Sequence, residues 1–209
     1  GSTGTDKLEN AFAGSLLNSG HDMDQDYHDD ILYVTYVKAE DATLDATTRW
    51  TEGGVLRLIT QEDLAGTELS GGATGTTALN PANWVLSKVI DDAGPITSSV
   101  VRLQNQKTNK LWLYFGAGRY FYEMSCAMDD PDTQRKIYGV IEPCFIDETS
   151  SFATACTNGV IGDDLTRTVG GLSDQTTETV ATITDGWKIS LDPKDSTTTD
   201  FANCSGGGI

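Results

Sequence analysis

The feature that most constrains the fold of this chain is a succession of short apolar runs, each bounded by Gly, Pro, Asp or Asn. The runs are rich in Val, Ile, Leu and aromatic residues, and they have the length of a buried β-strand. No segment shows a convincing long helical pattern. We therefore expect an all-β protein with about eight to ten strands. The main expected strands cover residues 31–37, 55–59, 84–90, 99–103, 111–116, 136–141, 180–184 and 187–191.

The segments between the strands predict how the strands are arranged. Asp185-Gly186 is a strong hairpin signal between the last two expected strands. Residues 38–52 and 62–83 are polar and rich in Thr and Gly, which predicts long surface loops that carry partner contacts. Strand clusters separated by such loops suggest β-propeller blades with a period of about 40–45 residues. We expect residues 1–209 to form a single propeller-type domain or part of one, and a β-sandwich remains the alternative.

Charge and hydropathy narrow the range of partners and locations. The net charge is −17 and the pI is about 4.2, which argues against a nucleic-acid partner. No apolar run is long enough to predict a membrane span. The first residues lack the charged start and apolar core of a signal peptide, and both ends are abrupt. We expect this chain to be a segment of a longer, extracellular or cell-surface protein.

The four cysteines support the same compartment. They are Cys126, Cys144, Cys156 and Cys204, and no C-x-x-C motif occurs, so zinc-ribbon and thioredoxin-type sites are unsupported. The alternatives are two disulfides or four buried thiols, and the secreted character of the composition favours disulfides. Four cysteines allow three pairings. We predict Cys144–Cys156, which closes a short and weakly patterned segment, together with Cys126–Cys204.

An acidic stretch directly before the first confident strand has the spacing of a calcium-binding loop. An EF-hand-type loop takes side-chain oxygens from positions 1, 3 and 5, a backbone carbonyl from position 7, and a further ligand from position 9. Oxygen ligands without cysteine favour calcium over zinc or copper. Numbering from Asp22 as position 1, the predicted calcium ligands are Asp22, Asp24, Asp26, the carbonyl of His28, and Asp30.

The loop departs from a helical EF-hand at two positions. Position 6 is Tyr27 instead of the usual Gly, and position 12 is Leu32 instead of a bidentate Glu. The segment that follows is a strand by composition, so we predict a calcium loop that leads into a β-strand and is completed by water or by a distant ligand. The alternative is an acidic, solvated turn.

Taken together, these motifs resemble the C-terminal β-propeller domain of the PilY family, the tip-associated biogenesis and adhesion proteins of bacterial type IV pili. Tyr114-Phe115-Gly116-Ala117-Gly118-Arg119-Tyr120 is similar to the family's Phe-Gly-Thr-Gly-Arg-Tyr motif. The acidic loop before a Tyr-Val strand looks like the family's calcium loop. Further motifs occur in the family's order, at residues 54–58, 94–99, 133–140 and 186–191.

The resemblance implies a calcium-dependent propeller module that acts in pilus biogenesis and surface adhesion and has no catalytic activity. Its implied partners are pilus subunits, other pilus-tip proteins, and a host or surface receptor. The sequence itself contains no catalytic motif: Gly116-x-Gly118 lacks the rest of a nucleotide-binding loop, and neither histidine lies beside a recognisable nucleophile motif. The alternative function is a quinoprotein-type propeller dehydrogenase, which would use calcium to hold a quinone cofactor.

Overall fold

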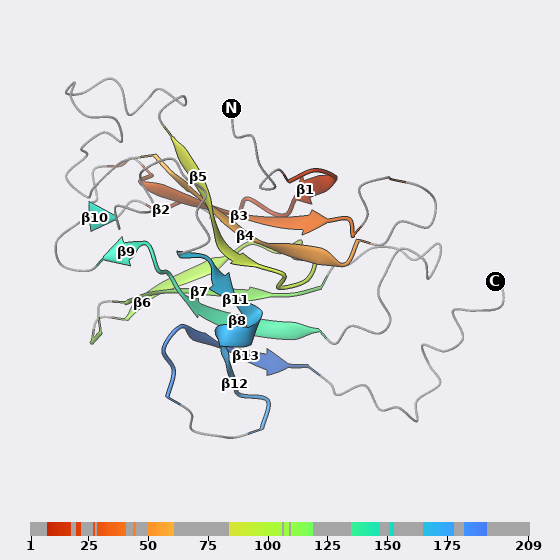
Figure 1. Cartoon of the computed structure of the whole chain (residues 1–209). Helices are drawn as coiled ribbons and strands as arrows, with labels where there is room; N and C mark the ends of the chain where they lie inside the picture. The colour runs from red at the N-terminus through yellow and green to blue at the C-terminus, as the bar shows by residue number, and fades with distance from the viewer. Residues whose placement is uncertain are drawn as a thin grey trace.

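A computed structural model describes residues 8–17, 20–21, 27, 29–40, 44, 50–60, 84–105, 107–108, 110–118, 135–146, 151–152, 165–177 and 182–191. Their regular structure is almost entirely β-strand, so the chain is all-β (Figure 1). The strands are β1 (Ala11–Ala13), β2 (Gly20–His21), β3 (Ile31–Lys38), β4 (Glu52–Ile59), β5 (Val85–Asp91), β6 (Val101–Asn105), β7 (Lys110–Gly116), β8 (Lys136–Ile141), β9 (Phe145–Ile146), β10 (Ser151–Phe152), β11 (Arg167–Thr168), β12 (Ser173–Asp174) and β13 (Gly186–Ser190).

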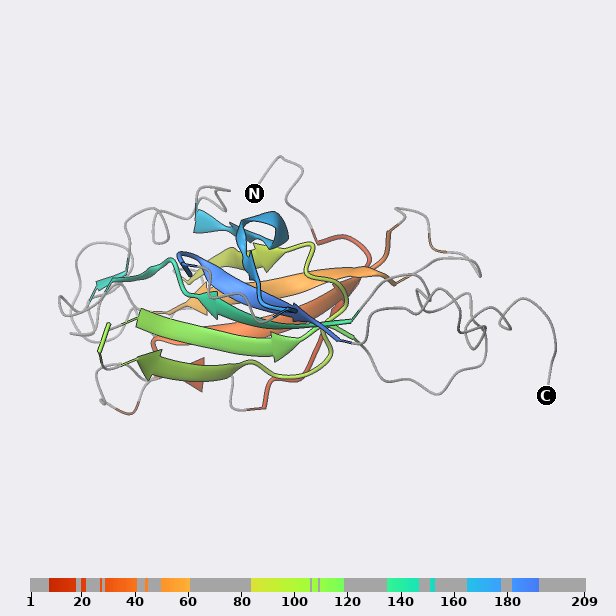
Figure 2. The ribbon, with the colours of Figure 1, turned by 90° about the horizontal axis from the view of Figure 1, so that it is seen from below.

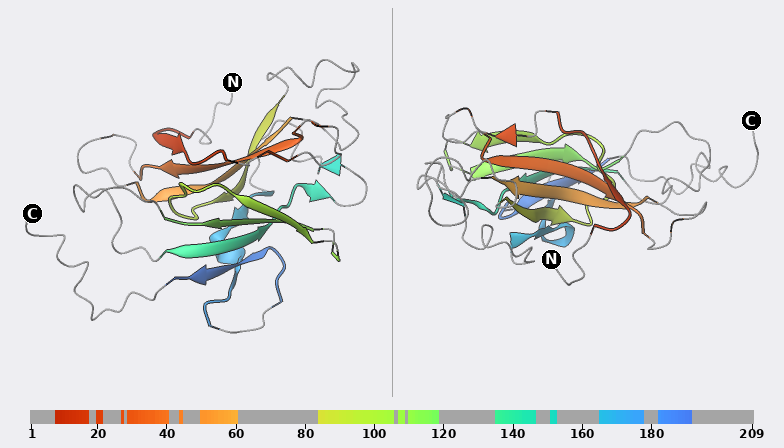
Figure 3. Two further views of the ribbon diagram at one scale, coloured as in Figure 1. Left: turned by 180° about the vertical axis from the view of Figure 1, so that it is seen from behind. Right: turned by 90° about the horizontal axis from the view of Figure 1, so that it is seen from above.

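The first sheet is built on β3 and β4, which pair antiparallel along their whole lengths. β5 continues the sheet antiparallel to β4, with an irregularity between Val55 and Leu56. On the other side, the short strands β1 and β2 pair with opposite ends of β3. β11 adds to β5 in parallel, so the main order is β1-β3-β4-β5-β11. Figure 3 shows β3 and β4 side by side in the view from above.

The second sheet has the order β12-β13-β8-β7-β6. The pairs β13–β8, β8–β7 and β7–β6 are antiparallel, and β12 joins β13 in parallel. β9 and β10 form a separate two-residue pair. The sequence predicted most of the long strands of both sheets because they are the most continuous apolar runs in the chain.

The hydrophobic core lies between the two sheets, which Figure 1 shows one above the other. Leu111, Leu113 and Phe115 on β7 are buried, whereas the alternating residues Trp112 and Tyr114 are partly exposed. This alternation follows from the two-residue period of a strand, which sends successive side chains to opposite faces. The buried cluster includes residues of β3, β4 and β5 from the first sheet and of β7 and β8 from the second.

One segment crosses from the first sheet to the second. β11 is followed by η4 (Val169–Gly171), a single 3-10 turn, and then by β12 beside β13 (Figure 1). Leu172 of this crossing is buried in the core, and the Lys188 ammonium donates a hydrogen bond to the Val169 carbonyl at 2.9 Å. No helix in the described ranges has the length and apolarity needed to cross a bilayer.

The hairpin predicted at Asp185-Gly186 is wrong. Thr182, Ile183 and Thr184 form no strand, and β13 pairs instead with the distant strand β8. Gly186 begins β13 with φ +140, a conformation that favours glycine. The two large sheets do not close into a barrel, and the propeller expectation is not confirmed by them.

Candidate functional site

The acidic loop predicted to bind calcium connects β2 to β3. His21 lies opposite Ile31 in the β2–β3 pair, and the Asp30 N–H donates to the His21 carbonyl at 2.9 Å. The loop over residues 22–30 therefore leaves and re-enters the first sheet at adjacent positions. The two ends of the loop are held together by the sheet.

Thr60, the residue after β4, fixes the end of this loop. Its N–H donates to the Asp30 carbonyl at 2.9 Å, and its hydroxyl donates to the Asp29 carbonyl. These two contacts tie the loop exit to the neighbouring strand. The exit therefore has a defined position relative to the first sheet.

Tyr27 has an unusual backbone conformation. Its φ is +73, in the left-handed region, and its side chain is 95% exposed. A residue other than glycine in this region costs about 1–3 kcal/mol and is often found at functional sites. Tyr27 is position 6 of the predicted calcium loop, where an EF-hand uses glycine for its sharp turn. The backbone thus adopts at Tyr27 the kind of conformation that glycine supplies there.

Among the predicted ligands, the structure describes the side chain of Asp30 alone. This side chain is fully buried at the base of the loop, although Asp29 beside it is exposed. A carboxylate in such a position needs compensation by hydrogen bonds, opposite charge or a cation. Asp22, Asp24, Asp26 and His28 lie outside the described residues. Within the described ranges, no three His, Cys, Asp or Glu side chains come together as a metal site.

A cation from the second sheet lies near the end of the loop. Burial lowers the pKa of Arg102, on β6, whereas the nearby Tyr33 and Asp29 raise it. Asp29 also packs closely over β2, because a Cβ added at Gly20 would lie 2.0 Å from Asp29 Oδ2. The sequence predictions did not include Asp29 or Arg102, since only their positions in the fold bring them together.

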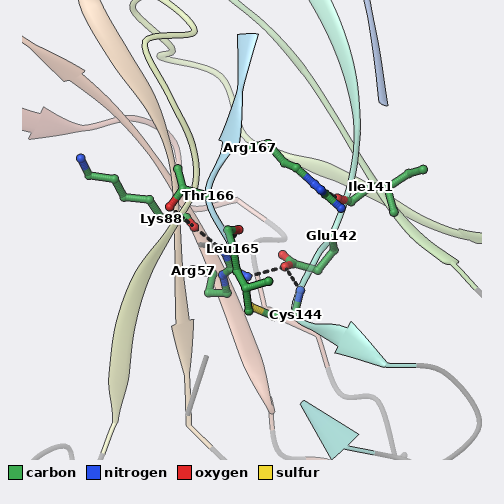
Figure 4. A network of polar contacts seen from close by, with 8 residues as sticks. All are labelled: Arg57, Lys88, Ile141, Glu142, Cys144, Leu165, Thr166 and Arg167. Carbon is green, nitrogen blue, oxygen red and sulfur yellow. Dashed lines mark hydrogen bonds and ion pairs between the residues drawn. The ribbon is translucent and has the colours of Figure 1, made fainter. Parts of the chain in front are cut away.

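Two other deeply buried charged groups, Arg57 and Glu142, form an ion pair between the two sheets. Arg57 Nη1 on β4 lies 2.6 Å from Glu142 Oε1, at the end of β8, and their side chains are 1% and 0% exposed (Figure 4). The Glu142 oxygen also accepts a hydrogen bond from the Cys144 N–H at 2.8 Å. Arg57 donates further to the Cys144 sulfur and to the carbonyls of Lys88 and Leu165. This network connects both sheets and the crossing segment.

Tyr33 is part of the same buried region. Burial raises the pKa of Tyr33 well above its usual range, and the negative charge of Glu142 raises it further, while Arg57 opposes this. The phenol is therefore neutral at every ordinary pH. The side chains of Arg57 and Glu142 are closed to solvent, and their contacts are those of a structural lock between the sheets.

Sequence reasoning missed this ion pair, although one signal was available. Arg57 is a lone charge in the apolar run of β4, at the same strand parity as the buried residues Val55 and Ile59. A charge at a core position is almost never fully buried without a partner. That partner could not be identified, because Glu142 lies 85 residues further along the chain.

Cys144, beside this pair, forms a disulfide bond. The other three cysteines, Cys126, Cys156 and Cys204, lie outside the described residues, so the partner of Cys144 is not identified. The pairing Cys144–Cys156 therefore stays a prediction.

Comparison of the chain with known proteins does not assign it to a family. No family model, no curated protein and no solved structure matches the chain.

Proposed function

We propose that this protein is a non-enzymatic, calcium-binding module of a PilY-like, type IV pilus-associated surface protein, acting in pilus biogenesis and surface adhesion. Its partners are pilus subunits or other pilus-tip proteins, together with a host or surface receptor. The ordered motifs of the sequence support the family, and the acidic loop supports calcium. The single observation that carries the calcium proposal is the left-handed backbone conformation at the sixth position, Tyr27, of a loop whose two ends are joined by the β2–β3 pair.

The residues that would hold calcium are the carboxylates of Asp22, Asp24, Asp26 and Asp30 and the carbonyl of His28. Four carboxylates on one short loop repel one another, and a divalent cation removes that repulsion. The ends of the loop are already joined by the β2–β3 pair and by Thr60, so binding does not have to close it. Less conformational entropy is then lost on binding than in an open linker.

We also propose that the two sheets are neighbouring blades of a β-propeller. Propeller blades are four-stranded sheets arranged around a central channel. β1, β3, β4 and β5 form one set of successive antiparallel strands, and β6, β7, β8 and β13 form the other. The shared core between the sets is consistent with two adjacent blades.

Calcium titration of thermal stability tests the proposal. At a calcium concentration about a hundredfold above Kd, binding to the folded state alone adds about 2.7 kcal/mol. For a chain of this length, the melting temperature should then rise by roughly 5–11 °C. The measurement is differential scanning calorimetry after chelator treatment, with calcium added stepwise and magnesium in a parallel series.

Asp26→Asn is the informative variant, because it removes one central carboxylate at nearly constant side-chain size. It should lose most of the calcium response, and its calcium-free stability should change little because carboxylate repulsion also falls. Asp174→Asn is the control, since Asp174 is an exposed carboxylate on β12 whose contact with the Thr176 N–H an amide oxygen can keep. Equal calcium responses in both variants would show that the loop is only an acidic turn.

A further inference from the structure

The free edge of β6 differs from the other edges of the two sheets. Within the described residues, the first sheet is bordered by β1, β2 and β11, and the second sheet is bordered on one side by β12. These four strands are only two or three residues long. β6, at the other border, has five residues, and β7 is its only partner among the strands that the structure describes. Proteins commonly protect an edge by making its strand short, so β6 is the exception here.

The outer face of β6 is apolar as well as exposed. Val101 and Leu103 are 62% and 59% exposed, and they lie opposite Tyr114 and Trp112 of β7. The rings of Trp112 and Tyr114 are nearly parallel, with centroids 6.2 Å apart. An aliphatic and aromatic surface therefore continues from the free edge onto the neighbouring strand. Figure 2 shows the two green strands of this hairpin at the rim of the molecule.

The charge of this region is opposite to that of the protein as a whole. The chain carries a net charge of −17, yet no Asp or Glu occurs between Ala93 and Tyr122. The exposed charges of the β6–β7 hairpin are Lys107 and Lys110. Arg102 lies on the other side of β6, toward Asp29 and Tyr33. A strand that approaches the free edge from the hairpin turn thus meets the positive charge of Lys107 and Lys110.

We propose that β6 is a docking edge for an extended, acidic segment of a partner protein, which adds to the second sheet as a further strand. Main-chain hydrogen bonds to the free edge supply affinity in this mode of recognition, and alternate side chains supply specificity. Apolar side chains of the added strand pack beside Val101 and Leu103, and its acidic residues complement the positive charge of Arg102, Lys107 and Lys110. A second copy of this chain fits less well, because its own β6–β7 hairpin carries Lys107 and Lys110 and has no carboxylate to face them.

This contact surface goes beyond the calcium-binding function and does not depend on it. The acidic loop is on the first sheet, whereas β6 belongs to the second. Calcium binding can therefore fail its own test without affecting strand addition, and strand addition can fail without affecting calcium binding.

Fluorescence polarisation with synthetic peptides tests the proposal. The probe is a short, capped, labelled peptide of alternating Val and Glu. Two control peptides have the same length. The first alternates Val and Lys. The second is the Val/Glu peptide with its backbone nitrogen methylated at every second residue, so that one edge of the peptide strand has no N–H groups to donate. We expect binding of the first probe and at least about tenfold weaker binding of both controls, since one has the wrong charge and the other cannot form edge hydrogen bonds.

Leu103→Glu should weaken binding of the Val/Glu peptide about tenfold, because it replaces an apolar contact with a like charge. Leu86→Glu is the matched control on β5 of the first sheet, where Leu86 is 40% exposed, and it should leave binding unchanged. Circular dichroism checks that both variants fold. Equal binding of the three peptides, or equal effects of the two variants, would overturn the proposal. Self-association in sedimentation that Leu103→Glu abolishes would also overturn it, by making a second copy the occupant.

Discussion

Glu142→Gln is the substitution that tests most directly how the two sheets are held together. It keeps the shape of the side chain and removes the charge that faces Arg57 across 2.6 Å. Arg57 would then remain as a buried cation that has hydrogen bonds to neutral oxygens and a sulfur but no opposite charge from residue 142. Breaking a buried ion pair by neutralising one partner typically costs about 3–5 kcal/mol, because the remaining charge stays in the core without compensation.

The loss should fall near the lower end of that range. The amide oxygen of Gln can still accept hydrogen bonds from Arg57 and from the Cys144 N–H, which Glu142 Oε1 accepts at 2.8 Å. We therefore expect Glu142→Gln to lower the free energy of unfolding by about 3 kcal/mol. For a chain of this length, this corresponds to a fall in melting temperature of roughly 6–12 °C. Urea denaturation followed by tryptophan fluorescence measures the change, with the m-value checked for constancy.

Two further variants make the reasoning refutable. Asp185→Asn breaks the ion pair between Arg167 and Asp185, whose side chains are 24% and 39% exposed, and should cost less than about 1 kcal/mol. The double variant Arg57→Met with Glu142→Leu should recover most of the stability, since apolar replacement of a buried pair is often neutral. If Glu142→Gln cost no more than Asp185→Asn, the pair would not be isolated from water and the proposed lock between the sheets would be wrong.

Two other predictions concern the second sheet. Burial raises the pKa of Tyr138 from 10.0 to about 12, so the folded state keeps a proton that the unfolded chain releases. The free energy of unfolding should thus fall as the pH rises above 10. Between pH 10 and 12, Tyr138→Phe should make this fall less steep by about 1.4 kcal/mol per pH unit. An unchanged slope in the variant would contradict this. Gly139→Ala should cost about 1–3 kcal/mol by urea titration, because its Cβ would lie 2.4 Å from the Trp187 ring. Gly170→Ala, with no atom within 4 Å of the added Cβ, is the control, and equal losses would refute the close approach.

The sequence alone could predict the long strands of both sheets. The expected strands at residues 31–37, 111–116 and 136–141 correspond closely to β3, β7 and β8. These segments are apolar on one or both faces, and that property belongs to the segment itself whatever it packs against. The acidic pattern from Asp22 to Asp30 could be recognised in the same way, since the predicted ligands lie close together in sequence.

The tertiary structure decided the features that depend on distant partners. β12 pairs in parallel with β13, and β11 joins β5, although the two-residue strands β11 and β12 have no pattern of their own. The turn at Gly186 serves the pairing of β13 with β8, which no local signal reveals.

The burial of Arg57 was decided in the same way, because its partner Glu142 is 85 residues away. Local residues determine which segments can form strands, since side-chain periodicity and backbone preference act within a few residues. The order in which strands pair and the partners of buried charges depend on which distant segments pack together in the core. Those contacts exist only when the whole chain has folded.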